Sequence, residues 1–300
     1  GAPGQDAALR ATVEAVTAMC RSLGLAIPVG KDSLSMQTRW CDDGGMRTMT
    51  APVSLNVSAF APVPDVTRVL TPALRIDGGD LLLIAPPSQR LGGSALAMAC
   101  ARELGDVPDV DDPAGLAAMF DALRDAVASG DVVAVHDRSD GGLLTTLLEM
   151  ALAGHAGAAV DLPGDADPLR FLFNEEIGLV VQCGRDAARR LGDRLARAGF
   201  GGRCMRIGTV TGDDRLRVRR GAETVLDRSL PELNRLWAAT SHRVQRLRDH
   251  PGCADEEYAA LADWARPGLT PRVTFGPRAP AALGGARPRV AVLREQGVNG

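Results

Sequence analysis

Residues 132–154, VVAVHDRSDGGLLTTLLEMALAG, join an apolar strand to an apolar helix through a short polar turn. Val132–Val135 has the length and composition of a buried strand, and leucines recur at helical spacing from Leu143 onward. The turn between them, HDRSDGG, contains two carboxylates, one hydroxyl and a pair of glycines. A strand that passes directly into a helix restricts the chain to a fold that mixes strands and helices.

The polar turn has the composition of a site for phosphate and a metal ion. A helix N-terminus attracts anions, and glycines such as Gly141 and Gly142 let a ligand approach the backbone. Asp137 and Asp140 would repel a phosphate, but Mg²⁺ placed between them and a nucleotide removes this conflict. The alternative is structural: Ser139 or Asp140 caps the helix, and Asp137 is a solvated loop residue. Spacing alone leaves both interpretations open.

A second polar loop contains the only lysine of the chain, Lys31, among 34 basic residues. The loop reads GKDSLSM and follows a short strand predicted at residues 26–29. It is not a Walker A loop, because the first glycine is misplaced and Asp32 stands where Ser or Thr would follow the lysine. It still offers backbone donors, a carboxylate and a compact ammonium, which the planar guanidinium of arginine does not replace. An ordinary turn with a surface lysine is the alternative.

The composition argues against several classes of protein. No apolar run approaches the ~20 residues of a membrane span, and the first residues lack the pattern of a secretory signal. The net charge of −3 and the 3% of aromatic residues argue against nucleic-acid binding. Six cysteines without a CxxC pair argue against a zinc site and indicate reduced thiols in the cytoplasm.

The length of 300 residues suggests about two domains, and hydrophobic periodicity predicts a mixture of helices and strands. We expect helices at residues 6–23, 114–129, 185–198 and 233–248, and a further helix from the turn at 91–94 to residue 104. We expect strands at residues 26–29, 53–61, 80–85, 132–135, 158–162, 177–182, 204–211 and 215–219, and a hairpin at 39–48. Residues 251–286 are rich in proline and glycine and read as a wrapping linker. Before the strand at 177–182, Asn174, Glu175 and Glu176 are either metal or substrate ligands or only its polar start.

Four segments resemble one enzyme family in the same order. HDRSDGGLLTTLLEMALAG closely resembles a signature of the large, single-chain form of phosphoribosylformylglycinamidine synthase, and PVGKDSLSM is similar to another segment of it. FNEE at residues 173–176 is typical of the same family. PRVAVLREQGVN at residues 288–299 resembles the first strand and loop of its class-I glutaminase domain.

The resemblance implies an α+β fold and a fragment of a longer polypeptide. Residues 1–68 would be the C-terminal part of a ferredoxin-like, N-type synthetase half-domain, and residues 69–230 a C-type half-domain of the aminoimidazole ribonucleotide synthetase-like type. Residues 231–286 would be a linker, and residues 287–300 the start of a class-I glutamine amidotransferase domain. The missing first ATP-binding half and the rest of the glutaminase would be the partners of this segment.

The family is a ligase of purine biosynthesis. ATP phosphorylates the amide oxygen of formylglycinamide ribonucleotide, and ammonia from glutamine replaces the phosphate to give the amidine. The resemblance implies that Asp137 is a Mg²⁺ ligand and that Ser139 contacts ATP or ADP. Asp32 is a further candidate metal ligand, and the further candidate nucleotide contacts are Lys31, Gly141 and Gly142. No catalytic residue is expected in this segment, and we expect the isolated chain to be poorly soluble and to have low or absent synthase activity.

Two other functions stay open. The second half of these synthases is thought to hold a nucleotide that does not react, so the segment can be a non-catalytic nucleotide-binding scaffold. A stand-alone ATP enzyme resembling aminoimidazole ribonucleotide synthetase or selenophosphate synthetase is the third possibility. These enzymes lack a glutaminase, so the segment at residues 288–299 weighs against that third possibility.

Overall fold

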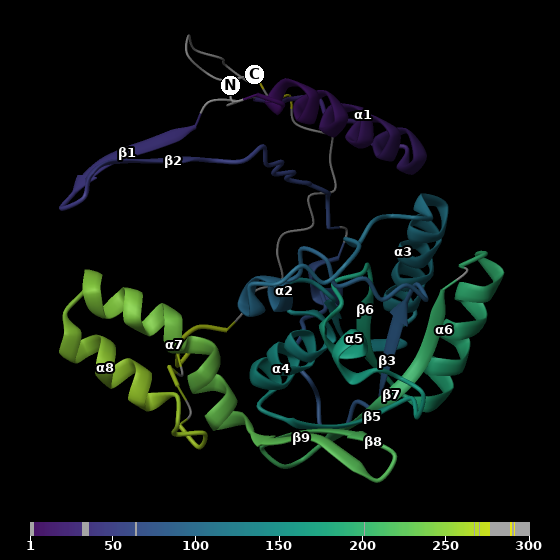
Figure 1. Ribbon diagram of the computed structural model, residues 1–300. Helices are drawn as coiled ribbons and strands as arrows, with labels where there is room; N and C mark the ends of the chain where they lie inside the picture. Colours follow the sequence, from purple (N-terminus) through teal and green to yellow (C-terminus); the bar gives the residue numbers. More distant parts are fainter. Residues whose placement is uncertain are drawn as a thin grey trace. The chain divides into compact units, whose positions relative to one another are not determined.

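The computed structural model divides the chain into two compact units (Figure 1). It describes residues 3–31, 36–63, 65–200, 202–266, 268–269, 271–276, 289 and 291. Unit 1 comprises Gly1–Ala61 and Pro267–Gly300, and unit 2 comprises Pro62–Arg266. Asp32 and nearly all of the segment at 287–300 lie outside the described residues.

The described part of unit 1 contains one helix and one β-hairpin. Helix α1 spans Gln5–Leu23 and ends at Gly24, whose φ of 65° is a conformation that glycine adopts readily. Strands β1, Gln37–Asp42, and β2, Gly45–Thr50, pair antiparallel. No residue of these three elements is buried. The helix and the hairpin predicted from the sequence are confirmed.

Unit 2 is organised around a seven-stranded sheet of order β4-β6-β3-β7-β5-β8-β9, in which β5 and β8 pair in parallel and the other neighbours pair antiparallel. A short 3₁₀ helix, Val66–Arg68, lies at the start of the unit. The strands are β3 Asp80–Ala85, β4 Val132–Asp137, β5 Gly157–Leu162, β6 Leu179–Cys183, β7 Arg203–Thr211, β8 Arg215–Arg220 and β9 Glu223–Ser229. The helices are α2 Ala95–Cys100, α3 Pro113–Ala128, α4 Gly142–Gly154, α5 Pro168–Phe173, α6 Arg185–Arg197, α7 Leu230–Arg248 and α8 Pro251–Ala260.

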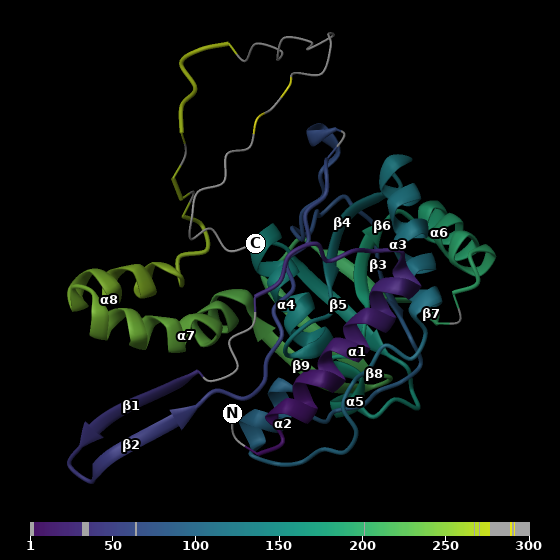
Figure 2. The same ribbon diagram turned by 90° about the horizontal axis from the view of Figure 1, so that it is seen from above.

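Helices cover both faces of the sheet (Figures 1 and 2). Alternate residues of β3 explain why DLLLIA is a continuous apolar run: Leu82 and Ile84 enter one core, and Leu81 and Leu83 enter the other. Helices α3 and α6 pack on the first face, and α4 and α5 on the second. One side of α4 is fully buried there, with Leu143 and Leu147 both 0% exposed, and Leu144 and Leu148 are partly buried beside it. This burial fixes the start of α4, and therefore the polar turn before it.

The structure differs from the sequence expectations at several elements. Residues 26–29 and 53–61 are not strands, since within the described part of unit 1 they join no sheet. Helix α2 ends at Cys100 rather than near residue 104, because Ala101 adopts a left-handed φ of 50°. Strand β9 is an additional element that the sequence pattern does not predict.

The segment 251–260 forms helix α8 instead of an irregular linker. Helices α7 and α8 make a hairpin in which the His242 and Tyr258 rings stack at 4.1 Å. Beyond α8, the Trp264 ring stacks on His155 at the end of α4, with 4.2 Å between ring centroids. The two ends of the hairpin are therefore both attached to the rest of unit 2.

No helix among the described residues is long and apolar enough to cross a membrane.

Candidate functional site

The polar turn of residues 137–142 lies where β4 ends and α4 begins. Strand β4 is an edge strand of the sheet. It pairs with β6, so that Asp137 lies opposite Leu179. The segment just before β6, residues 174–176, therefore lies close to the turn. The Glu175 carboxylate accepts hydrogen bonds from the turn and from the start of α2. Three segments that are far apart in the sequence meet at this site.

The Asp137 carboxylate is part of a chain of polar contacts. One oxygen accepts a hydrogen bond from the Ser139 hydroxyl, and the other lies 3.0 Å from His136 Nδ1. His136 Nε2 lies 3.0 Å from a carboxylate oxygen of Glu149 on α4. The Ser139 hydroxyl, and then His136, lower the pKa of Asp137 despite its partial burial. The side chain of Asp137 is 65% exposed, so an ionised and oriented carboxylate faces solvent.

The backbone conformation at positions 141 and 142 favours glycine. Their φ angles are 84° and 69°, both in the left-handed region. A Cβ on Gly142 would lie 2.7 Å from the carbonyl oxygen of Leu172, so the glycine also allows close packing against the end of α5. The Gly142 N–H donates to the Ser139 carbonyl at 2.9 Å.

Glu175 occupies the anion-binding position at the start of α4. Its Oε1 accepts hydrogen bonds from the Gly141 N–H at 2.7 Å and from the Ala95 N–H at the start of α2 at 2.8 Å. A carboxylate of the protein thus receives the Gly141 N–H, a donor that the sequence analysis assigned to a phosphate. From the sequence, Glu175 could be either a metal or substrate ligand or only the polar start of a strand. The signal that points to it is the FNEE segment.

A network of charged side chains, Arg90, Arg138 and the buried Glu176, lies next to the turn. Glu176 is 0% exposed and accepts from Arg90 Nε at 2.6 Å and from the Arg90 N–H at 3.0 Å. Burial alone would raise the pKa of Glu176, but Arg90 outweighs it and the pKa is lowered. Arg138 points inward and donates to the carbonyls of Glu176 and Ile177 at 2.8 and 3.1 Å. Burial lowers the pKa of Arg138 to about 10, so Arg138 stays charged at neutral pH.

The structure brings together four of the predicted site residues. Asp137, Ser139, Gly141 and Gly142 share the turn, and the Asp140 carboxylate has no hydrogen bond or ion pair within the described part of the chain. Lys31 belongs to unit 1, where it lines a cavity of about 730 Å³ along α1. Sequence reasoning missed His136 and Glu149. Their contact with each other could not be inferred from local spacing.

The residues of the turn fit a magnesium–nucleotide in part. Asp137 supplies an ionised, exposed carboxylate with free lone pairs, and Mg²⁺ commonly uses only one or two protein carboxylates together with phosphates and water. Among the described residues no group of three or more His, Cys, Asp or Glu side chains could hold a metal alone. The N–H groups of Gly141 and Gly142 are already engaged, so these glycines shape the turn rather than offer free donors.

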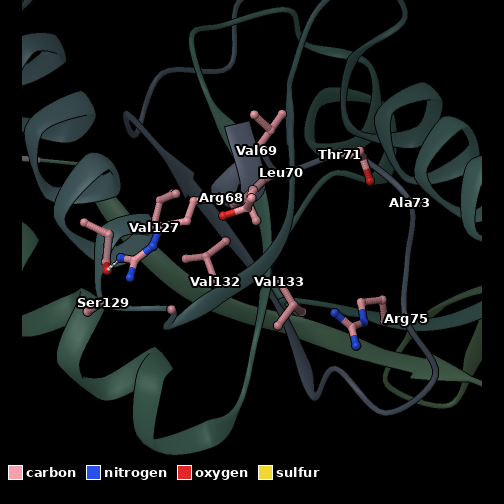
Figure 3. A pocket seen from close by; sticks show the side chains of 13 residues that line it. Arg68, Val69, Leu70, Thr71, Ala73, Arg75, Val127, Ser129, Val132 and Val133 are labelled. Carbon is pink, nitrogen blue, oxygen red and sulfur yellow. Dashed lines mark hydrogen bonds between the residues drawn. The ribbon is translucent and has the colours of Figure 1, made fainter. Parts of the chain in front are cut away.

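A separate cavity of about 580 Å³ lies at the other end of β4 (Figure 3). Residues 67–75, the end of α3 and the first residues of β4 line it. It contains none of the residues of the turn.

Two parts of the chain match family models. Residues 1–62 match the FGAR-AT PurM_N-like domain, and residues 77–221 match the C-terminal domain of AIR synthase related proteins. The second match confirms the expected α+β class, with a second half-domain of the AIR synthase type.

Solved structures share the fold. PurL from Thermotoga maritima complexed with FGAR matches 72% of this chain and 36% of its own, with a TM-score of 0.52 and 16% identity. T. maritima PurL complexed with ATP matches 73% of this chain and 34% of its own, with a TM-score of 0.50 and 15% identity. The chain thus spans about a third of the length of the PurL chains.

Proposed function

We propose that this chain is a segment of a phosphoribosylformylglycinamidine synthase of the large, single-chain form, and that it holds a magnesium–nucleotide at the turn of residues 137–142. The observation that carries the proposal is the succession of two domain types in one chain, an FGAR-AT PurM_N-like domain followed by an AIR synthase C-terminal domain. The proposed boundaries are those expected from the sequence, with the glutaminase domain starting near residue 287.

The proposed reaction is an amidation. The T. maritima PurL structures with FGAR and with ATP support formylglycinamide ribonucleotide and ATP as substrates. ATP would phosphorylate the amide oxygen, and glutamine-derived ammonia would displace the phosphate to give the amidine. The scattered cysteines support a cytoplasmic location.

In this proposal the residues of the turn bind and orient. Asp137, kept ionised by the Ser139 hydroxyl, would hold Mg²⁺, which supplies charge neutralisation to the nucleotide phosphates when bound. Glu149 orients His136, and His136 in turn orients the Asp137 carboxylate. Ser139 is exposed and is the proposed nucleotide contact, while Gly141 and Gly142 hold the turn in shape. Lys31 and Asp32 are proposed as further nucleotide and metal contacts.

A non-catalytic scaffold is the second candidate function. It is favoured because Glu175 already accepts from the Gly141 N–H and the Ser139 carbonyl accepts from the Gly142 N–H, so neither donor is free to stabilise charge on a reacting phosphate. In that case the nucleotide would hold this half-domain in shape without being consumed.

The test is Asp137→Ala in the intact enzyme, with Asp193→Ala, an exposed carboxylate on α6 outside the turn, as the control. We expect Asp137→Ala to abolish Mg²⁺-dependent retention of ADP, measured on the purified protein, while Asp193→Ala retains it. Steady-state turnover then separates the two candidates: a loss of turnover indicates a reacting nucleotide, and near-normal turnover without bound ADP indicates the scaffold. Retention of ADP by Asp137→Ala at the wild-type level would refute the proposed site.

A further inference from the structure

We infer that the 580 Å³ cavity between residues 67–75 and the first residues of β4 binds a small organic anion, with its charged head on the guanidinium of Arg75. This site is distinct from the turn of residues 137–142. Strand β4 runs from Val132 in the cavity to Asp137 in the turn, and a strand rises ~3.3 Å per residue, so the two sites lie at opposite ends of one strand. The inference does not depend on the proposed function.

The charge of the cavity is one-sided. Its 13 lining residues include two arginines and no acidic residue. Within the described part of the chain, Arg68 and Arg75 form ion pairs only with Asp65 and Asp77, at 3.4 and 3.7 Å, and all four side chains are largely exposed. Exposed pairs of this kind contribute little, so an incoming anion can replace them at small cost.

Both arginines stand on fixed backbone. The Arg75 N–H donates to the side-chain carbonyl of Gln182 at 2.9 Å, and the Gln182 amide donates to the Arg75 carbonyl at 2.5 Å. Gln182 is 0% exposed, so it holds the Arg75 backbone against the sheet while the guanidinium remains exposed. Arg68 Nη1 donates at 2.7 Å to the Ala128 carbonyl at the end of α3. The backbone that carries the Arg75 guanidinium is therefore fixed before a ligand binds, which lowers the cost of binding.

The cavity also offers an apolar surface. Figure 3 shows Val132 and Val133 between the two arginines, with Val69 and Leu70 beside Arg68. A volume of about 580 Å³ falls in the range of sites for small metabolites. Guanidinium groups recognise carboxylates and phosphates with paired hydrogen bonds, and valine side chains favour an apolar body. The ligand class is therefore a carboxylate or phosphate attached to a small apolar group.

The experiment titrates the full chain by calorimetry in EDTA, so that no metal is available to the turn at Asp137. The probes are phenyl phosphate, benzoate and inorganic phosphate. Arg75→Met removes the charge at nearly constant length, and Arg189→Met on α6 is the control, because Arg189 is also exposed and weakly paired, at 3.8 Å from Asp186. Thermal unfolding confirms that both variants fold.

We expect phenyl phosphate or benzoate to bind at one site, and phenyl phosphate to bind about tenfold more tightly than inorganic phosphate because its ring is buried. Arg75→Met should weaken this binding about tenfold, the loss of one charge-assisted contact, and Arg189→Met should change it less than twofold. The relative affinity of the two aromatic probes identifies the preferred head group. Absence of saturable binding to the wild type, or an equal loss in Arg189→Met, would overturn the inference.

Discussion

At Gly142 the conformation of one residue decides the geometry of the turn. The left-handed φ of 69° disfavours any side chain, and a Cβ added here would come within 2.7 Å of the Leu172 carbonyl oxygen. Asp137 and Ser139 precede this residue, so a shift of the backbone here would displace the proposed metal ligand. The glycine is therefore explained by packing, independently of any ligand.

We predict that Gly142→Ala destabilises the protein by roughly 2–5 kcal/mol, the sum of a left-handed alanine and an overpacked contact. Gly221→Ala is the control, since Gly221 has a φ of 58° but no atom within 4 Å of the added Cβ, and it should cost only roughly 1–2 kcal/mol. Urea unfolding at neutral pH measures both. Equal losses in the two variants would show that the contact with α5 does not restrict this position.

The residues of the turn could be predicted from the sequence because they are consecutive. Asp137, Ser139 and the glycines stand together in any fold that has a strand before them and a helix after them. Glu175 could not be predicted in the same way, because it lies 34 residues from Gly141 and 80 from Ala95. Such a long-range contact leaves no periodic trace in the sequence.

Among the elements, Asp131 joins α3, β4 and α6. It follows the end of α3 and precedes β4. It accepts hydrogen bonds from Arg190 and forms an ion pair with Arg194, both on α6, and its own side chain is only 8% exposed. Arg190, followed by Ser129 and Arg194, holds the pKa of Asp131 down to about 2, although burial opposes this. The contact therefore stabilises the packing of α6 on the sheet only while Asp131 is ionised.

We predict that Asp131→Asn lowers the free energy of unfolding by about 1–2 kcal/mol at pH 7, a value that allows for the half-exposed Arg190. The folded pKa of about 2 lies below the unfolded value of ~3.9, so the contribution is complete above pH ~4 and is lost as pH falls toward 2. Unfolding curves of wild type and variant should therefore converge near pH 2. The control is Asp186→Asn, which removes an exposed pair and should leave stability nearly unchanged at both pH values. A constant difference between wild type and Asp131→Asn across this range would contradict the assignment.

The elements that the sequence predicts well are those whose periodicity comes from burial. Strand β3 and helices α3 and α4 carry apolar residues in register with a core, and their bounds agree with the sequence to within about two residues. Helix α8, PGCADEEYAA, has no apolar stripe, because only Ala254 is buried, and its sequence therefore resembles a linker. The segments at 26–29 and 53–61 have strand-like composition but no partner strand among the described residues. Composition alone does not make a strand.

The two units of the molecule differ in what holds them together. Unit 2 has two cores of fully buried residues around its sheet, whereas α1, β1 and β2 of unit 1 contain none. Apolar side chains of unit 1 remain exposed instead, among them Val13 at 56% and Met46 at 67%. A helix beside a two-stranded hairpin buries too little apolar surface to compensate for its loss of conformational entropy. The two units match family models of two different domain types. Their difference in burial predicts that unit 1 is less stable than unit 2.

We predict that the amides of α1 exchange with solvent at least a hundredfold faster than those of β3 and β6 when the isolated chain is studied by hydrogen exchange, because local opening of unit 1 breaks no buried contact. Cooperative unfolding should then report unit 2 alone.

If the chain is a synthase segment, helix α1 should be protected in the intact enzyme. The isolated chain should neither consume ATP nor convert the amide substrate. The central strand β3 serves as the internal control, since its protection should be equal in both proteins. Strong protection of α1 in the isolated chain would show that unit 1 is stable by itself, and the argument from its exposed apolar surface would then be wrong.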